Sequence, residues 1–128
     1  MENPQRKVTY PTPKGSQKCD NSVDAKWTNN KATDWQGKDW YRVSDIIGTR
    51  IPTSPTKGWH CGVWASGWIK QDSDPAIWET KIAKACFAPP NMDNCRYSET
   101  IKVRNCGDFL LYYLTDARQM CNSGYCVE

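Results

Sequence analysis

Several polar side chains gather between two tryptophans in residues 68–79, and their types point to a binding chemistry. Asp72, Asp74 and Glu79 supply carboxylate oxygens in this stretch, and Gln71 supplies an amide. Calcium in proteins takes roughly six to eight oxygen ligands, so we predict the three carboxylates as calcium ligands. Their spacing is not that of an EF-hand loop, and a solvated acidic turn is the alternative interpretation.

The aromatic residues around this segment offer a surface for sugars. The chain has seven tryptophans among its 128 residues. An exposed indole ring beside polar groups is a common platform for a sugar ring. The predicted sugar contacts are four residues: Trp64, Trp68, Gln71 and Trp78. For any single tryptophan, filling a core that is poor in aliphatic side chains is the alternative.

Catalytic motifs are absent from the sequence. His60 stands next to Cys61, but neighbouring residues on a strand point to opposite faces and do not form a nucleophile pair. No G-x-S-x-G, H-E-x-x-H, P-loop or G-x-G-x-x-G motif occurs. We therefore predict that the protein is not an enzyme.

Cysteine content indicates the compartment. The chain has seven cysteines, and they stand at Cys19, Cys61, Cys86, Cys95, Cys106, Cys121 and Cys126. Zinc sites favour C-x-x-C pairs, which do not occur, although a structural zinc site is an open alternative. A disulfide framework in a secreted, extracellular protein is the favoured interpretation. One cysteine is left over, and we expect it to be unpaired or to link two chains as a homodimer.

Charge and segment composition exclude other partners. The formal net charge is +3, and no run of five or more like charges occurs, so neither nucleic acid nor a membrane surface is an expected partner. No apolar stretch is long enough for membrane insertion. No leader is visible, and we expect Met1 to be an added start on a mature secreted chain. No N-glycosylation sequon occurs either.

Periodicity predicts a mainly β protein. Residues 1–18 are rich in proline and polar residues and are expected to form a flexible arm, followed by a single domain over 19–128. Strands are predicted over 40–44 and 59–70, and a hairpin over 99–105 and 109–114. Residues 76–87 fit either a helix or a strand, and strand is favoured. The expected fold is a disulfide-rich antiparallel β domain with long loops, and a small α+β fold is the alternative.

A set of short motifs follows one order from Asp39 onward. They are DWYRV (39–43), GTRIP (48–52), CG (61–62), GW (67–68), PAIWE (75–79), ACF (85–87), IKVRNCGDFLLYYL (101–114) and SGYCVE (123–128). In this order they resemble the eight-cysteine domain, or decoy module, of uromodulin, of the pancreatic zymogen-granule membrane glycoprotein and of oikosin-type extracellular proteins. The resemblance implies an extracellular β domain in which Trp40 and Trp68 are core residues.

The sequence departs from this family in its cysteines. The family has an even set, and its most N-terminal cysteine is missing here, so we predict Cys19, its neighbour, as the odd cysteine. Asp72 to Pro75 also stand where the family has its G-x-H-P motif. The favoured function is a lectin-like module that binds glycans or extracellular glycoproteins with calcium assistance. The alternative is a structural or adhesion module of the extracellular matrix that acts through protein contacts.

Overall fold

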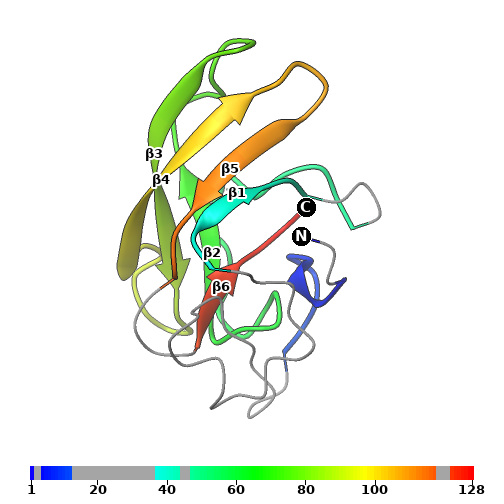
Figure 1. Ribbon diagram of the computed structural model, residues 1–128. Coiled ribbons are helices and arrows are strands. Elements are labelled where there is room, and N and C mark those ends of the chain that lie inside the picture. The colour runs from blue at the N-terminus through cyan, green and yellow to red at the C-terminus, as the bar shows by residue number, and fades with distance from the viewer. Residues whose placement is uncertain (2–3, 13–36, 44–46, 118–121) are drawn as a thin grey trace.

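Alternation of apolar and polar side chains builds the longest strands. The computed structural model describes residues 1, 4–12, 37–43, 47–117 and 122–128. Within this part of the chain, β3 (Thr80–Ala88) pairs with β4 (Tyr97–Asn105), and β4 pairs with β5 (Leu110–Leu114). The β4–β5 hairpin turns at Cys106 to Phe109, as the sequence predicts. These strands form the upper part of the sheet in Figure 1.

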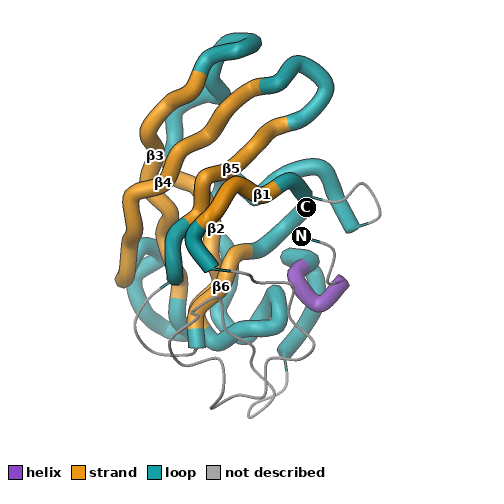
Figure 2. Tube along the Cα trace, viewed as in Figure 1, coloured by secondary structure: helices purple, strands orange, loops and turns teal. Residues whose placement is uncertain are grey.

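Six strands join in one curled sheet in the order β1-β5-β4-β3-β2-β6 (Figures 1 and 2). The other three are β1 (Asp39–Tyr41), β2 (Ala65–Lys70) and β6 (Ser123–Tyr125). All neighbours are antiparallel except β2 and β6, which run parallel. The predicted mainly β fold with an antiparallel sheet is therefore confirmed.

One face of the sheet, which we call the inner face, carries the core. Its fully buried side chains come from every strand, because each strand turns alternate residues to this side. They include Phe87, Ile101, Val103, Tyr112 and Tyr125. Burial of such side chains stabilises a fold by about 1.5–3 kcal/mol each.

In the described part of the chain, the outer face is covered at the β6 end of the sheet. The bond between Cys86 and Cys95 holds the β3–β4 connection against this end. Trp68 lies there with 6% of its surface exposed, and its indole N–H donates to the carbonyl of Asn94 at 2.8 Å. The prediction of Trp68 as a core residue is confirmed. Trp40, also predicted as core, is 41% exposed, because it lies on the outer face of the edge strand β1 and packs on Tyr113.

The N-terminal segment packs against the end of the chain. A short 3-10 helix, η1 (Pro4–Arg6), precedes a parallel bridge between Lys7 and Val127. The Arg6 side chain is buried and donates to the carbonyl of Tyr125 at 3.1 Å. Residues 4–12 are therefore docked rather than part of a flexible arm. The rest of the arm that was predicted over 1–18, apart from Met1, lies outside the described residues.

Three strand predictions need correction in their bounds. Of the predicted 40–44 strand, β1 covers 40–41, and residues 42–43 are not a strand. Residues 59–64 form turns and bends with an isolated bridge from His60 to Pro11, and only 65–70 of the predicted 59–70 strand is a strand. Trp59 and Cys61 have φ angles of 58° and 62°, which a strand does not accept. The strand interpretation of 76–87 is confirmed over 80–87 by β3.

Candidate ligand-binding site

A hollow of about 410 Å³ lies where β2 ends beside β3. β2 stops at Lys70, which pairs with Lys84, whereas β3 continues back to Thr80. Among the described strands, none pairs with this edge of β3 before Lys84, and the chain after β2 passes beside it. The hollow is lined by Lys70, Gln71, Asp72, Ser73, Lys81, Ile82 and Lys84.

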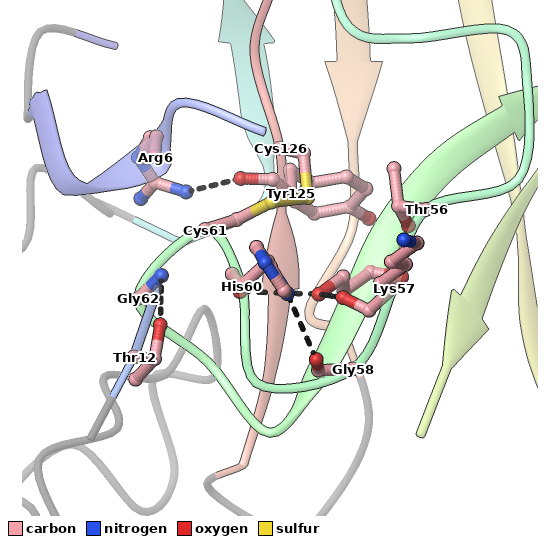
Figure 3. The surroundings of a disulfide bond; sticks show 11 residues. Arg6, Thr12, Thr56, Lys57, Gly58, His60, Cys61, Gly62, Tyr125 and Cys126 are labelled. Carbon is pink, nitrogen blue, oxygen red and sulfur yellow. Dashed lines mark hydrogen bonds between the residues drawn. A yellow bond between two sulfur atoms is a disulfide. The ribbon is translucent and has the colours of Figure 1, made fainter. Parts of the chain in front are cut away.

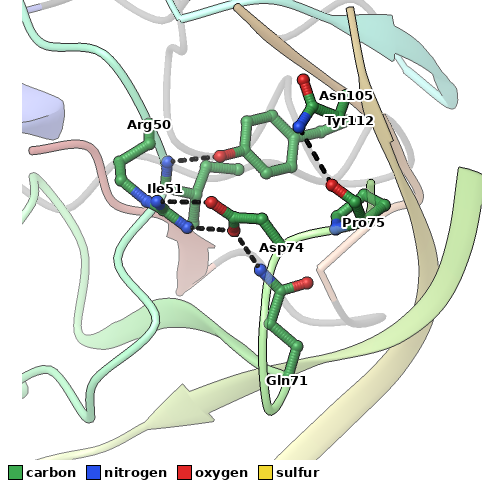
Figure 4. A network of polar contacts seen from close by, with 7 residues as sticks. All are labelled: Arg50, Ile51, Gln71, Asp74, Pro75, Asn105 and Tyr112. Carbon is green, nitrogen blue, oxygen red and sulfur yellow. Dashed lines mark hydrogen bonds and ion pairs between the residues drawn. The ribbon is translucent and has the colours of Figure 1, made fainter. Parts of the chain in front are cut away.

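An ion pair holds the loop that borders this hollow (Figure 4). The guanidinium of Arg50 donates to both carboxylate oxygens of Asp74, at 3.0 and 2.7 Å. The amide of Gln71 donates to the same carboxylate at 2.8 Å. Asn105 donates its amide to the carbonyl of Pro75 at 2.9 Å. These contacts join the β2–β3 loop to the segment before β2 and to the end of β4.

Burial and charge shift the pKa values of this network. The hydrogen bonds from Arg50 lower the pKa of Asp74, and the reciprocal contact raises the pKa of Arg50. Burial raises the pKa of Tyr112 to about 12. The Tyr112 hydroxyl accepts a hydrogen bond from the Ile51 amide at 3.0 Å, next to the ion pair. Asp74 is therefore ionised and Tyr112 is neutral at neutral pH.

Trp78 is displayed on the same loop. Its side chain is 66% exposed and its φ is 68°, an uncommon conformation for a bulky residue. The backbone holds it there, because the Trp78 amide donates to the Asn105 carbonyl at 2.7 Å and the Glu79 amide donates to the Ala76 carbonyl at 2.8 Å. Neighbouring Ile77 is 62% exposed.

The structure separates the predicted calcium ligands. Asp74 is bound by Arg50, and a carboxylate oxygen of Glu79 accepts from the Ala76 amide at 3.3 Å. Asp72 is exposed in the hollow. In the described ranges, no three His, Cys, Asp or Glu side chains come together in a way that would hold a metal. Binding of calcium at these residues would require Asp74 to break its ion pair with Arg50.

The predicted sugar contacts also occupy different places. Gln71 lines the hollow, and Trp78 is exposed farther along the loop. Trp64 is half-buried and packs on the core, and Trp68 is covered by the β3–β4 connection. Sequence reasoning missed the lysines of the hollow, which no local motif marks. The strand pairing of Lys70 with Lys84 brings them together.

Among the described cysteines, two disulfides staple the β6 end of the domain. Cys61 bonds to Cys126, and Cys86 bonds to Cys95. In Figure 3, the first bond lies among backbone contacts of the turn before β2, where Thr12 accepts from the Gly62 amide at 2.8 Å. His60 contacts the Gly58 carbonyl at 3.0 Å, and its neighbour Cys61 is bonded, so the pair does not form a nucleophilic site.

Cys106 is a free thiol in the β4–β5 turn, and it is half-buried. This residue was not singled out by the sequence analysis, which predicted Cys19 as the odd cysteine. Cys19 and Cys121 lie outside the described residues. Among the cysteines that the structure describes, Cys106 is the one with no disulfide partner.

Fold and bonds together define a class: a small, mainly antiparallel β module stapled by disulfides, of the kind that occurs in oxidising compartments. Residues 41–127 match the model of the uromodulin-like domain family, and the chain belongs to this family. The family consists of non-enzymatic modules typical of extracellular proteins. In the described part of the chain, no helix has the length and apolar character needed to cross a membrane.

Proposed function

We propose that the chain is an extracellular glycan-binding module whose ligand occupies the hollow beside β3. The observation that carries this proposal is the lining of the hollow. Gln71, Asp72 and Ser73 supply an amide, a carboxylate and a hydroxyl, which are the groups that bind sugar hydroxyls, and Ile82 adds an apolar surface. A single sugar buries little area, so its affinity is expected to be about millimolar.

A glycan array, followed by calorimetry on the best ligand, tests this function. Asp72→Ala should weaken binding about tenfold, since it removes a charge-assisted hydrogen bond. Asp108→Ala is the matched control, because Asp108 is an exposed aspartate in the β4–β5 turn and does not line this hollow. Equal losses in the two variants, or no glycan on the array, would contradict the proposal.

Calcium assistance is tested by the same measurement in EDTA. The hydrogen-bonding groups of the hollow support binding without a metal, and the Arg50–Asp74 pair opposes a calcium site. Equal affinity with and without EDTA is therefore the expected result. A loss in EDTA that Asp74→Ala also causes would restore the calcium-assisted form of the hypothesis.

A structural module of the extracellular matrix is the second candidate. Cys106 favours it, because a half-buried thiol at a turn is accessible for a bond to another chain in an oxidising compartment. Such a module would run as a covalent homodimer on non-reducing electrophoresis, and Cys106→Ser would convert it to a monomer. A monomer before the substitution would count against this function.

A further inference from the structure

Positively charged side chains gather on the bare part of the outer face of the sheet. Pairing places Lys70 beside Lys84 and Ile82 beside Lys102, and Arg104 follows on the same side of β4. Lys38 reaches the same face next to β1, where its Nζ lies 5.8 Å from the centre of the Tyr113 ring. We call the set of Lys38, Lys70, Lys84, Lys102 and Arg104 the cationic face.

The charge of this face is not balanced by its own strands. The strand positions that turn to the outer face carry no aspartate or glutamate, because Asp39 and Glu99 fall on the inner side of the alternation. Five cations exceed the net charge of the whole chain, which is +3. The hollow opens at one margin of the face, since Lys70 and Lys84 belong to both.

Folding alone does not account for this arrangement. Like charges directly opposite each other on neighbouring strands are destabilising, and Lys70 faces Lys84 in this way. Lysines are used to protect the open edges of sheets, which accounts for Lys81 and Lys84 beside the open part of β3. It does not account for Lys102 and Arg104, because β4 is an interior strand. Charges kept against stability, as in the pair of Lys70 and Lys84, are typical of functional surfaces.

Aromatic rings are interleaved with the cations. Trp40 packs on Tyr113 with ring centres 5.2 Å apart, and the ammonium of Lys102 lies 5.7 Å from the Tyr113 ring. Rings on the open face of a sheet support sugar rings, and the ammonium groups between them attract acidic substituents. From β2 to β1 the face spans four strand spacings, or about 19 Å, so it fits an extended chain rather than one sugar.

We infer that the ligand of this domain is an anionic, sulfated polysaccharide, which follows the cationic face and enters the hollow beside β3. The inference rests on the proposed glycan-binding function and adds the chemical class of the glycan. Sulfated chains present fixed negative charges at intervals along a line of sugar rings. A sulfated glycan is favoured over nucleic acid because the family and the disulfides are typical of extracellular proteins.

Heparin binding by calorimetry at several salt concentrations tests the inference on the whole chain. The wild type should bind heparin, with an affinity that falls steeply as salt is raised. Lys84→Glu with Lys102→Glu should weaken binding by about tenfold or more. The control is Lys7→Glu with Lys57→Glu, which changes net charge equally at exposed lysines outside the sheet and should bind like the wild type.

Misfolding is excluded by the melting temperature of the same variant. Lys84→Glu places an acid opposite Lys70, so the double variant should melt no lower than the wild type.

Heparin binding that survives in this variant would overturn the inference. Equal binding to duplex DNA or to vesicles rich in phosphatidylserine would overturn it as well, since the face would then select charge alone. Binding of neutral glycans without heparin would overturn the inference and leave the proposed function standing, and no glycan binding would remove both.

Discussion

The two ends of the sheet along the direction of its strands are held differently. At the end where β6 lies, covalent bonds fix the chain. At the opposite end, where β2 turns into β3, the β2–β3 loop is fixed by an ion pair and side-chain hydrogen bonds. The first end has Cys61–Cys126 and Cys86–Cys95. The second has the ion pair of Arg50 with Asp74 and the hydrogen bond that the Ile51 amide donates to the Tyr112 hydroxyl. The first end should therefore respond to reductant, and the second to pH and salt. The candidate ligand site lies at the second end.

Reduction of the disulfides should have the largest effect. Closing loops with separations of 65 and 9 residues contributes roughly 4 and 3 kcal/mol on the chain-entropy model. The melting temperature should fall by about 20 °C or more when both bonds are reduced. Calorimetric melts with and without a thiol reductant measure this fall. A melt that stays the same after complete reduction would show that the core alone holds the β6 end.

Alkaline pH should weaken the opposite end through Tyr112. Its pKa is raised to about 12 in the folded state, against about 10 when unfolded, so the unfolded chain loses the proton first. Stability is intact below pH 10 and should fall by at most about 1.4 kcal/mol per pH unit between pH 10 and 12.

Tyr112→Phe is the matched variant for this pH effect. It should cost about 1–3 kcal/mol at neutral pH, because the buried Ile51 amide loses its acceptor, and it should remove the Tyr112 part of the alkaline loss. Urea unfolding at pH 7, 10 and 11 separates the two effects. An alkaline loss that is the same in the variant and the wild type would assign it to other groups.

The Arg50–Asp74 pair should have the smallest effect. The pair is partly exposed, and such pairs contribute about 1 kcal/mol or less. Asp74→Asn should lower stability slightly at low salt and hardly at all at high salt, and Asp72→Asn is the control. In the wild type, the lowered pKa of Asp74 means that this contribution is present above the unfolded pKa and is lost as pH falls through the folded one. Urea unfolding at two salt concentrations measures it, and an effect that salt does not change would argue against an ionic role.

Local patterns in the sequence were enough to predict the sheet but not the site. The alternation around Ile101 and Val103 predicted β4, and the apolar residues after Phe109 predicted β5. The contact of Arg50 with Asp74 joins residues 24 apart in different loops, and no local pattern indicates it. Trp40 was predicted as core, but its exposure depends on β1 being an edge strand.

A search for runs of like charge does not detect the cationic face. Strands turn every second residue to the same side, so Lys102 and Arg104 lie on one face although Val103 stands between them. Lys70 and Lys84 meet only through the register of β2 and β3. A search for consecutive like charges misses such a surface, and a search at a spacing of two would find only the part on β4.

The parallel bridge between Lys7 and Val127 has a mechanical consequence. Both ends of the described chain leave the domain at one place (Figure 1), so a pull on the two ends loads this bridge in shear. Behind it, the bond from Cys61 to Cys126 closes a covalent loop around residues 62–125, which force on the backbone cannot lengthen. Residues 8–12, 37–43 and 47–60 lie outside this closed loop. β2 to β6 lie inside the closed loop, and they keep their shape under a load that draws out the chain before them.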